Sequence, residues 1–115
     1  MLLYGIPNCD TVRKARAWLR ERGVEYAFHD LRKEGLDRSL LARWEAIVGW
    51  ERLLNRRGIT WRRLPPERRE GVDREHALAL LEEHPTLVKR PVTEWPDGTV
   101  TVGFDADDWT ARIGR

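Results

Sequence analysis

The chain has 115 residues, of which 41% are hydrophobic, so it can bury the core of one domain with a modest insertion, and wholesale disorder is excluded. Its 21 basic and 19 acidic residues leave a net charge of only +2, and no basic stripe points to nucleic acid. No apolar run approaches the roughly 20 residues of a membrane span, and no signal core follows the N-terminus. We therefore expect a soluble, cytoplasmic protein that contacts neither a membrane nor nucleic acid directly.

The first segment of the chain predicts a strand, a helix and a second strand. Residues 2–4 form a short apolar run, and a helical apolar pattern follows, with Asp10 or Thr11 as the natural N-cap and Gly23 at its end. Residues 24–28 then alternate as a strand. This order predicts a βαβ unit with a right-handed crossover.

The middle of the chain, residues 32–84, carries no strand signal. Asp37 is placed to cap a helix that Gly49 ends, and Asp73 is placed to cap another helix that must stop before Pro85. We predict that residues 32–84 form a helical insertion.

Strand signals return near the C-terminus. Residues 87–88 and 92–95 read as short strands, residues 99–102 follow a turn, and Asp105 is placed to cap a last helix. The order βαβ, helical insertion, ββα predicts an α/β fold with a mixed sheet. Its core would consist of residues 1–31 and 85–115.

The six tryptophans fall into two predicted groups. Trp18, Trp44 and Trp109 lie on apolar helix faces, which predicts that they belong to the core. The other three lie near the edges of segments, where we expect partial exposure: Trp50, Trp61 and Trp95.

Cys9 is the one cysteine, which excludes a disulfide framework, a cysteine-rich zinc site and an internal redox pair. It lies where the first strand has ended and the first helix begins, so free backbone N–H groups and the helix dipole favour its thiolate. Arg13, one turn into the helix, adds a cation. Cys9 is therefore a candidate nucleophile. The three histidines have no metal-ligand spacing, and we expect no metal site.

Arg90-Pro91 lies between two short strand-like runs. Because proline cannot donate to a strand ladder, Pro91 belongs at a turn, an edge or a cis bond. In a sheet of this order, the loop before the third strand lies beside the start of the first helix, close to Cys9.

Three motifs resemble the arsenate reductase-like (ArsC/Spx) family: YGIPNCDTVRKA at residues 4–15, LLNRRG at 53–58 and VKRP at 88–91. The resemblance covers essentially the whole chain and is strongest to the YffB-like branch of glutathione-dependent thiol reductases. It implies a thioredoxin-like fold with a helical insertion.

Carried over residue by residue, the resemblance makes Cys9 the reactive thiol and Pro91 a cis-proline, while Arg90 holds an oxyanion or a substrate carboxylate. Gly5 stands where arsenate reductases of the family keep a histidine, and Gly103-Phe104 falls near their third arginine. The arsenate pocket therefore looks incomplete. The loop at residues 55–57 falls where arsenate reductases of the family place another anion-binding arginine; Asn55 takes that position, so Arg56 or Arg57 would substitute for it. The substrate-binding residues implied are Arg90, Pro91, Arg13, Thr11, Asn8, Asn55 and Arg57.

The function implied is that of a monothiol oxidoreductase. Spx-type regulators carry a Cys-x-x-Cys switch, but here Val12 takes the second position, so Cys9 must form a mixed disulfide that an external thiol resolves. We expect glutathione or another small thiol as co-substrate, glutaredoxin as a candidate partner, no bound cofactor, and a monomer. Two alternatives stay open: an Spx-like, non-catalytic adaptor that binds RNA polymerase, and a true arsenate reductase.

Overall fold

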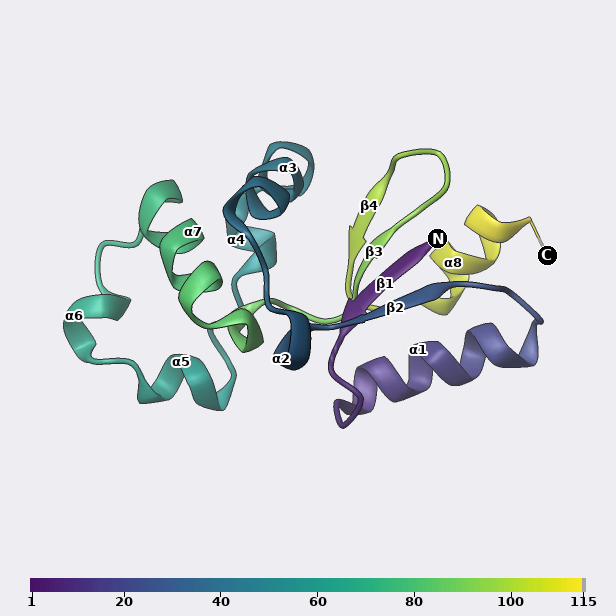
Figure 1. Cartoon of the computed structure of the whole chain (residues 1–115), viewed down its shortest axis with the longest axis horizontal. Coiled ribbons are helices and arrows are strands. Elements are labelled where there is room, and N and C mark those ends of the chain that lie inside the picture. Colours follow the sequence, from purple (N-terminus) through teal and green to yellow (C-terminus); the bar gives the residue numbers. More distant parts are fainter. Residues whose placement is uncertain (115) are drawn as a thin grey trace. The chain divides into compact units, whose positions relative to one another are not determined.

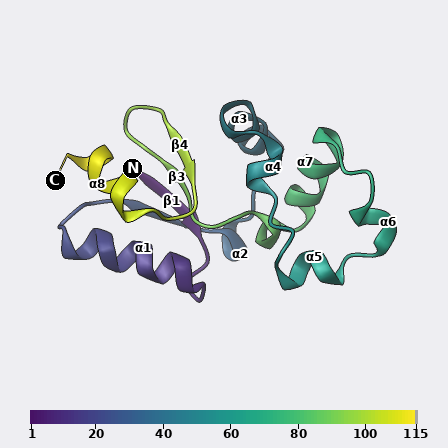
Figure 2. The ribbon, with the colours of Figure 1, turned by 180° about the vertical axis from the view of Figure 1, so that it is seen from behind.

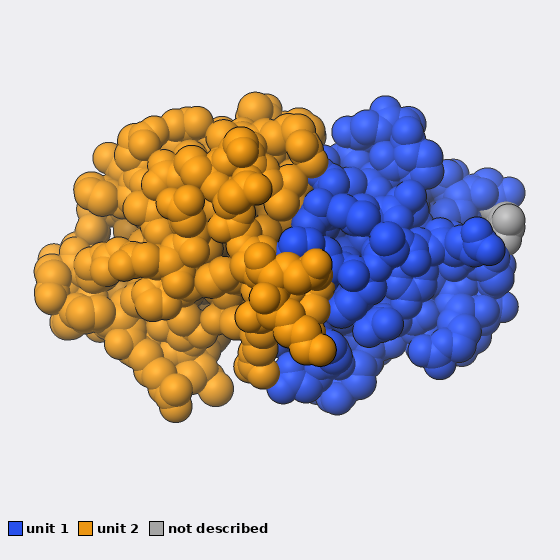
Figure 3. Space-filling model, viewed as in Figure 1, with its two compact units in different colours: residues 1–29, 90–115 blue, residues 30–89 orange. Residues whose placement is uncertain are grey.

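The computed structural model describes residues 1–114, which form two compact units coloured in Figure 3. The sheet unit comprises residues 1–29 and the segment from Arg90 onward, and the helical unit comprises residues 30–89. The sequence placed these boundaries at 31/32 and 84/85, whereas the contacts divide the chain at 29/30 and 89/90. No helix among the described residues has the length and apolar character needed to span a membrane.

The sheet unit is built on a four-stranded sheet in the order β2-β1-β3-β4 (Figure 1). β3 pairs antiparallel with both β1 and β4, while β2 runs in the same direction as β1 and is joined to it through α1. This mixed sheet with its two helices confirms the predicted α/β fold. The elements are β1 (Leu2–Gly5), α1 (Asp10–Glu21), β2 (Ala27–Asp30), β3 (Val92–Glu94), β4 (Val100–Val102) and α8 (Ala106–Ile113).

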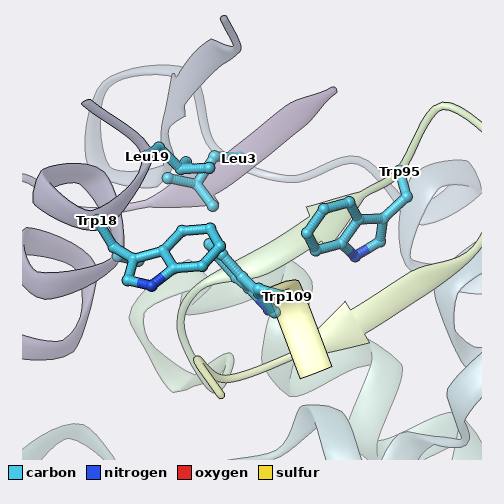
Figure 4. Close-up of a cluster of buried hydrophobic side chains, with 6 residues drawn as sticks. Leu3, Trp18, Leu19, Trp95 and Trp109 are labelled. Atoms are coloured by element: carbon cyan, nitrogen blue, oxygen red, sulfur yellow. The ribbon is translucent and has the colours of Figure 1, made fainter. Parts of the chain in front are cut away.

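The core of the sheet unit lies where α1 and α8 pack against one face of the sheet (Figure 4). Trp109 of α8 meets Trp18 of α1 edge-on at 5.9 Å between ring centroids, and meets Trp95 edge-on at 5.2 Å. Leu3 of β1 and Leu19 of α1 complete the centre of the cluster. Such edge-to-face pairs stabilise a core beyond the area that they bury.

The expected partial exposure of Trp95 is wrong, because only 6% of this residue is exposed. β1 pairs with β3 through Leu3 and Thr93, and side chains two apart on a strand share a face, so Trp95 points to the same side as Leu3. Its indole Nε1–H donates to the hydroxyl of Thr101 at 2.9 Å, which gives the buried polar group a partner.

Two predicted strands differ from those observed. The strand expected at residues 24–28 begins only at Ala27, although the apolar side chains before it still pack against the core. The strand expected at residues 87–88 is wrong. A 3-10 turn, η1 (Pro85–Leu87), stands there because Pro85 starts a turn readily, and Val88 makes only a single bridge to Leu54.

The helical unit is organised around three helices that contact one another, α3, α4 and α7 (Figure 2). The Asp37 carboxylate caps α3 by accepting from the Leu40 N–H at 2.8 Å, and the Asp73 carboxylate caps α7 by accepting from the His76 N–H at 2.9 Å, as predicted. The helices of this unit are α2 (Leu31–Glu34), α3 (Arg38–Val48), α4 (Trp50–Leu53), α5 (Ile59–Arg63), α6 (Pro66–Arg69) and α7 (Arg74–Glu83).

Candidate active site

The sheet register brings together two segments that are far apart in the sequence. Tyr4, near the end of β1, pairs with Val92, the first residue of β3. The turn that follows β1 and the loop that precedes β3 therefore leave the sheet at the same end. Cys9 follows the first of these segments, and Arg90-Pro91 closes the second, as the sequence predicts.

Cys9 is the N-cap residue of α1, so the prediction of Asp10 or Thr11 at this position is wrong. Its backbone is extended, with φ −89° and ψ 128°, and its carbonyl accepts the first helical bond from the Arg13 N–H at 2.9 Å. The Cys9 N–H donates back to Ile6 at 3.2 Å, which closes the turn directly onto the helix. Cys9 thus occupies the position at which a polar N-cap side chain would accept hydrogen bonds from the free N–H groups of the first turn.

The environment of the Cys9 thiol lowers its pKa. Partial burial raises the pKa, but the other groups around the sulfur together outweigh it: the Val12 N–H, the side chain of Arg90, through both a hydrogen bond and its charge, and the Thr11 N–H. The thiol remains partly exposed. A partly exposed thiolate held by N–H groups and a guanidinium is a competent nucleophile.

Arg90, rather than Arg13, is the cation that stabilises the thiolate. Arg13 lies one turn along α1, and its guanidinium bonds the carboxylate of Asp10, three residues earlier on the exposed face of the helix. The prediction that Arg13 supplies the positive charge beside Cys9 is corrected accordingly. Helical spacing places Arg13 next to Asp10. The sequence placed Arg90 close to Cys9, but it did not show which of the two arginines contacts the thiol.

The peptide bond between Arg90 and Pro91 is cis, as the resemblance implies. Pro91 is buried, and its carbonyl accepts from the Gly103 N–H at 2.8 Å, which ties the loop before β3 to the end of β4. Gly103 has a φ of +86°, a conformation that favours glycine. Arg90 therefore directly precedes a residue that a backbone hydrogen bond from the end of β4 holds in place.

Two departures from the arsenate reductase pattern have a structural reason. A Cβ atom added to Gly5 would lie 2.7 Å from a methyl group of Val12, so a side chain at this position would clash with α1 unless the neighbouring atoms moved. Phe104 packs edge-on against Trp109 at 4.7 Å and joins the core cluster. Position 5 is therefore a close backbone approach and Phe104 is part of the core packing, and neither places a polar side chain at the site.

The remaining predicted residues fall into two places. Asn8 and Thr11 are exposed and flank Cys9 in the chain. Asn55 and Arg57 belong to the helical unit, in the loop between α4 and α5, where the Asn55 carboxamide oxygen accepts from the Arg57 N–H at 3.0 Å. The sequence predicted that free backbone N–H groups at the start of the helix favour the thiolate, and the Val12 and Thr11 N–H groups are these donors.

Known proteins resemble this chain over almost its whole length. A family model described as the ArsC family matches residues 4–112. The solved structure of the protein YFFB is 44% identical, with 97% of each chain covered and a TM-score of 0.93. An arsenate reductase (ArsC) related protein from Brucella melitensis is 47% identical over 99% of this chain and 94% of its own, with a TM-score of 0.76. The global transcriptional regulator Spx of Enterococcus faecalis is 29% identical over 94% of this chain and 82% of its own.

Proposed function

Because the chain belongs to the ArsC family, we propose that it is a monothiol oxidoreductase that forms a mixed disulfide at Cys9 and uses glutathione as its co-substrate. The observation that carries the proposal is the partly exposed thiol at the start of α1, whose pKa is lowered by the Val12 N–H and by Arg90 despite burial. A thiolate is the attacking species in disulfide exchange.

The proposed reaction has two steps. The Cys9 thiolate attacks the glutathione sulfur of a glutathione-containing disulfide, a new S–S bond joins Cys9 to glutathione, and the other sulfur leaves as a thiolate that takes a proton from water. The thiolate of a second glutathione then attacks the mixed disulfide, which releases Cys9 and oxidised glutathione. Because Cys9 is the one cysteine of the sequence, the resolving thiol must come from another molecule.

Glutathione suits the charges around the thiol. It carries two carboxylates, and a guanidinium such as that of Arg90 binds a carboxylate with two parallel hydrogen bonds. Pro91 follows Arg90 through a cis peptide bond in the loop beside the start of α1. Asn8 and Thr11, which flank Cys9 in the chain, are exposed and offer further polar groups to a substrate. Glutaredoxin is a candidate second donor of the resolving thiol.

Arsenate is a poorer substrate in this proposal. A tetrahedral oxyanion needs several fixed donors, and Gly5 and Phe104 supply none where arsenate reductases of the family have side chains for it. We expect weak or absent arsenate reduction even when glutathione and glutaredoxin are supplied.

Mass spectrometry after exposure to oxidised glutathione tests the proposal. We expect one glutathione adduct on the wild-type protein, none on Cys9→Ser, and release of the adduct by added glutathione. Catalytic turnover of a mixed disulfide, followed as formation of oxidised glutathione, should depend on Cys9 in the same way. A wild-type protein that gains no adduct would show that the thiol is not the working group.

The alternative function is that of an adaptor resembling the transcriptional regulator Spx. The observation that favours this alternative is the 29% identity to the Enterococcus faecalis protein. In that case the chain would bind RNA polymerase without catalysis. Adduct formation without any turnover, together with polymerase binding that survives Cys9→Ser, would support the adaptor over the enzyme.

A further inference from the structure

The sheet unit has an open edge at β2, which is the outermost strand on one side of the sheet (Figure 1). The Ala27 N–H donates to the Met1 carbonyl at 3.0 Å and therefore points toward β1. Because the N–H and C=O groups of successive residues in a strand point to opposite sides, those of Tyr26 and Phe28 point away from the sheet. Unpaired groups of this kind are a template for pairing with another chain.

This open edge is short, because the outward N–H groups on either side of it already have acceptors. The Val24 N–H donates to the Leu19 carbonyl at 3.0 Å, and the Asp30 N–H donates to the Glu34 carboxylate at 3.1 Å. An added strand would therefore bond to Tyr26 and Phe28 only. We call residues 26–28 the β2 edge.

The side chains of the same two residues hold one arginine of α1. The Arg16 guanidinium lies 4.0 Å from the ring centroid of Phe28, and its Nε–H donates to the Tyr26 hydroxyl at 2.9 Å. All three residues are half-buried. The stacking contact and the hydrogen bond together orient the guanidinium beside the β2 edge, so it loses little conformational entropy when a partner binds.

The charge of Arg16 is not compensated from within the protein. Among residues 1–114, no carboxylate pairs with its guanidinium and no acceptor bonds its two terminal nitrogens. Arg13, three residues earlier on the same helix, differs because the Asp10 carboxylate bonds its guanidinium. The terminal nitrogens of an arginine form the fork that binds a carboxylate with two parallel hydrogen bonds.

From these observations we propose that the β2 edge is a docking site for an extended, acidic segment of a partner protein, which adds a strand to the sheet and pairs a carboxylate with Arg16. In an antiparallel addition, the residue opposite Phe28 exchanges two backbone hydrogen bonds with it, and its side chain lies on the same face of the sheet as the Phe28 ring. A carboxylate there meets the guanidinium that stacks on that ring. Backbone pairing supplies affinity, and the pair with Arg16 supplies specificity.

The test uses the full-length Cys9→Ser protein, in which thiol chemistry is abolished, so its outcome is independent of the proposed oxidoreductase function. The probe is a heptapeptide with capped ends that alternates glutamate and valine, which places its carboxylates on one face of an extended strand. The peptide is titrated while the backbone amide and arginine Nε–H signals are followed by NMR. We expect saturable shifts of the Tyr26 and Phe28 amide signals and of the Arg16 Nε–H signal.

Two altered peptides separate the two kinds of contact without changing the protein. A peptide with glutamine in place of every glutamate should bind about tenfold more weakly, because it loses the charge-assisted hydrogen bonds to Arg16. A peptide methylated at the backbone nitrogen of each glutamate keeps its carboxylates but cannot donate to the Phe28 carbonyl, so it should also bind more weakly. Binding of either altered peptide that equals binding of the parent peptide would overturn the proposal.

Protein variants test whether Arg16 is responsible. Arg16→Gln should weaken binding of the glutamate peptide about tenfold and change binding of the glutamine peptide little, a difference that a merely structural role of Arg16 would not produce. The matched control is Lys14→Gln, which removes the same charge from an exposed position of α1 and should bind like the parent. An equal effect of Lys14→Gln would overturn the proposal. So would shifts of the Tyr26 and Phe28 amide signals when the protein alone is concentrated, because a second copy would then occupy the edge.

Discussion

Replacing Arg90 with glutamine should change the reactivity of Cys9 in opposite directions at low and high pH. The Arg90 guanidinium contributes a hydrogen bond and a charge that help to lower the thiol's pKa against the opposing effect of burial. Without it, less of the cysteine is ionised near pH 6. Because a less stabilised thiolate is a stronger nucleophile, the fully ionised variant should react faster than the wild type.

The size of both effects follows from the geometry. A hydrogen bond to a charged group contributes about 1.5–3 kcal/mol. Because Cys9 is partly exposed, we place the contribution of Arg90 at or slightly below the lower end of this range. Its loss corresponds to a roughly tenfold smaller fraction of thiolate in Arg90→Gln when most of the cysteine is protonated. With a nucleophilicity coefficient of about 0.4–0.5, the intrinsic rate rises about threefold. We therefore expect Arg90→Gln to react about threefold more slowly near pH 6 and about threefold faster near pH 10.

The assay is the rate of exchange with a neutral aromatic disulfide, which removes any attraction between the probe and the guanidinium. Arg90→Lys should lie between the wild type and Arg90→Gln, because it retains the charge but loses the two-point geometry. The matched control is Arg13→Gln, whose arginine pairs with Asp10 and should leave both rates unchanged. Rates that are unchanged at both pH values, or slower at both with unaltered melting temperatures, would refute the role given to Arg90.

Two further predictions concern stability. Gly5→Ala should lower the free energy of unfolding, measured in urea, by about 1–3 kcal/mol, because the new methyl group would lie 2.7 Å from Val12. Adding Val12→Ala to the same chain should relieve much of the loss caused by Gly5→Ala. Strictly additive effects of the two substitutions would contradict the contact. The hydrogen bond from the Leu40 N–H lowers the pKa of the Asp37 carboxyl in the folded protein. The ionised Asp37 cap therefore stabilises the fold fully above the unfolded-state pKa of about 3.9, and this stabilisation is lost as the pH falls through the lower folded-state pKa. Asp37→Asn retains a capping oxygen and should lose less stability than the wild type between about pH 5 and pH 2, whereas parallel curves would exclude the effect.

The parts of the fold that were predicted from the sequence are those fixed by local chemistry. Asp37, Asp73 and Asp105 are helix caps because a carboxylate accepts the free N–H groups of the first turn, a local interaction that a single sequence displays. The burial of Trp95 was missed because it depends on the register between β1 and β3 and on the approach of α8, both of which are non-local.

The same distinction holds for the candidate site. The position of Cys9 at the start of a helix could be read from its neighbours, and the adjacency of Arg90 could be inferred from strand order. The choice between Arg13 and Arg90 as the partner of the thiol could not be made, because it depends on Asp10 capturing Arg13 on the outer face of α1.

The features that activate the thiol are separable from those that select a substrate. Two of the groups that lower the pKa of Cys9 are backbone N–H groups, which any residue at positions 11 and 12 other than proline would supply, and the third is Arg90. An oxyanion pocket needs additional side chains, and neither Gly5, which lies close to Val12, nor Phe104, which packs against Trp109, contributes a polar one. We therefore expect that Cys9 can be reactive in a protein that reduces arsenate weakly or not at all. Since the sequence holds no second cysteine, the mixed disulfide that we propose at Cys9 can be resolved only by a thiol from another molecule.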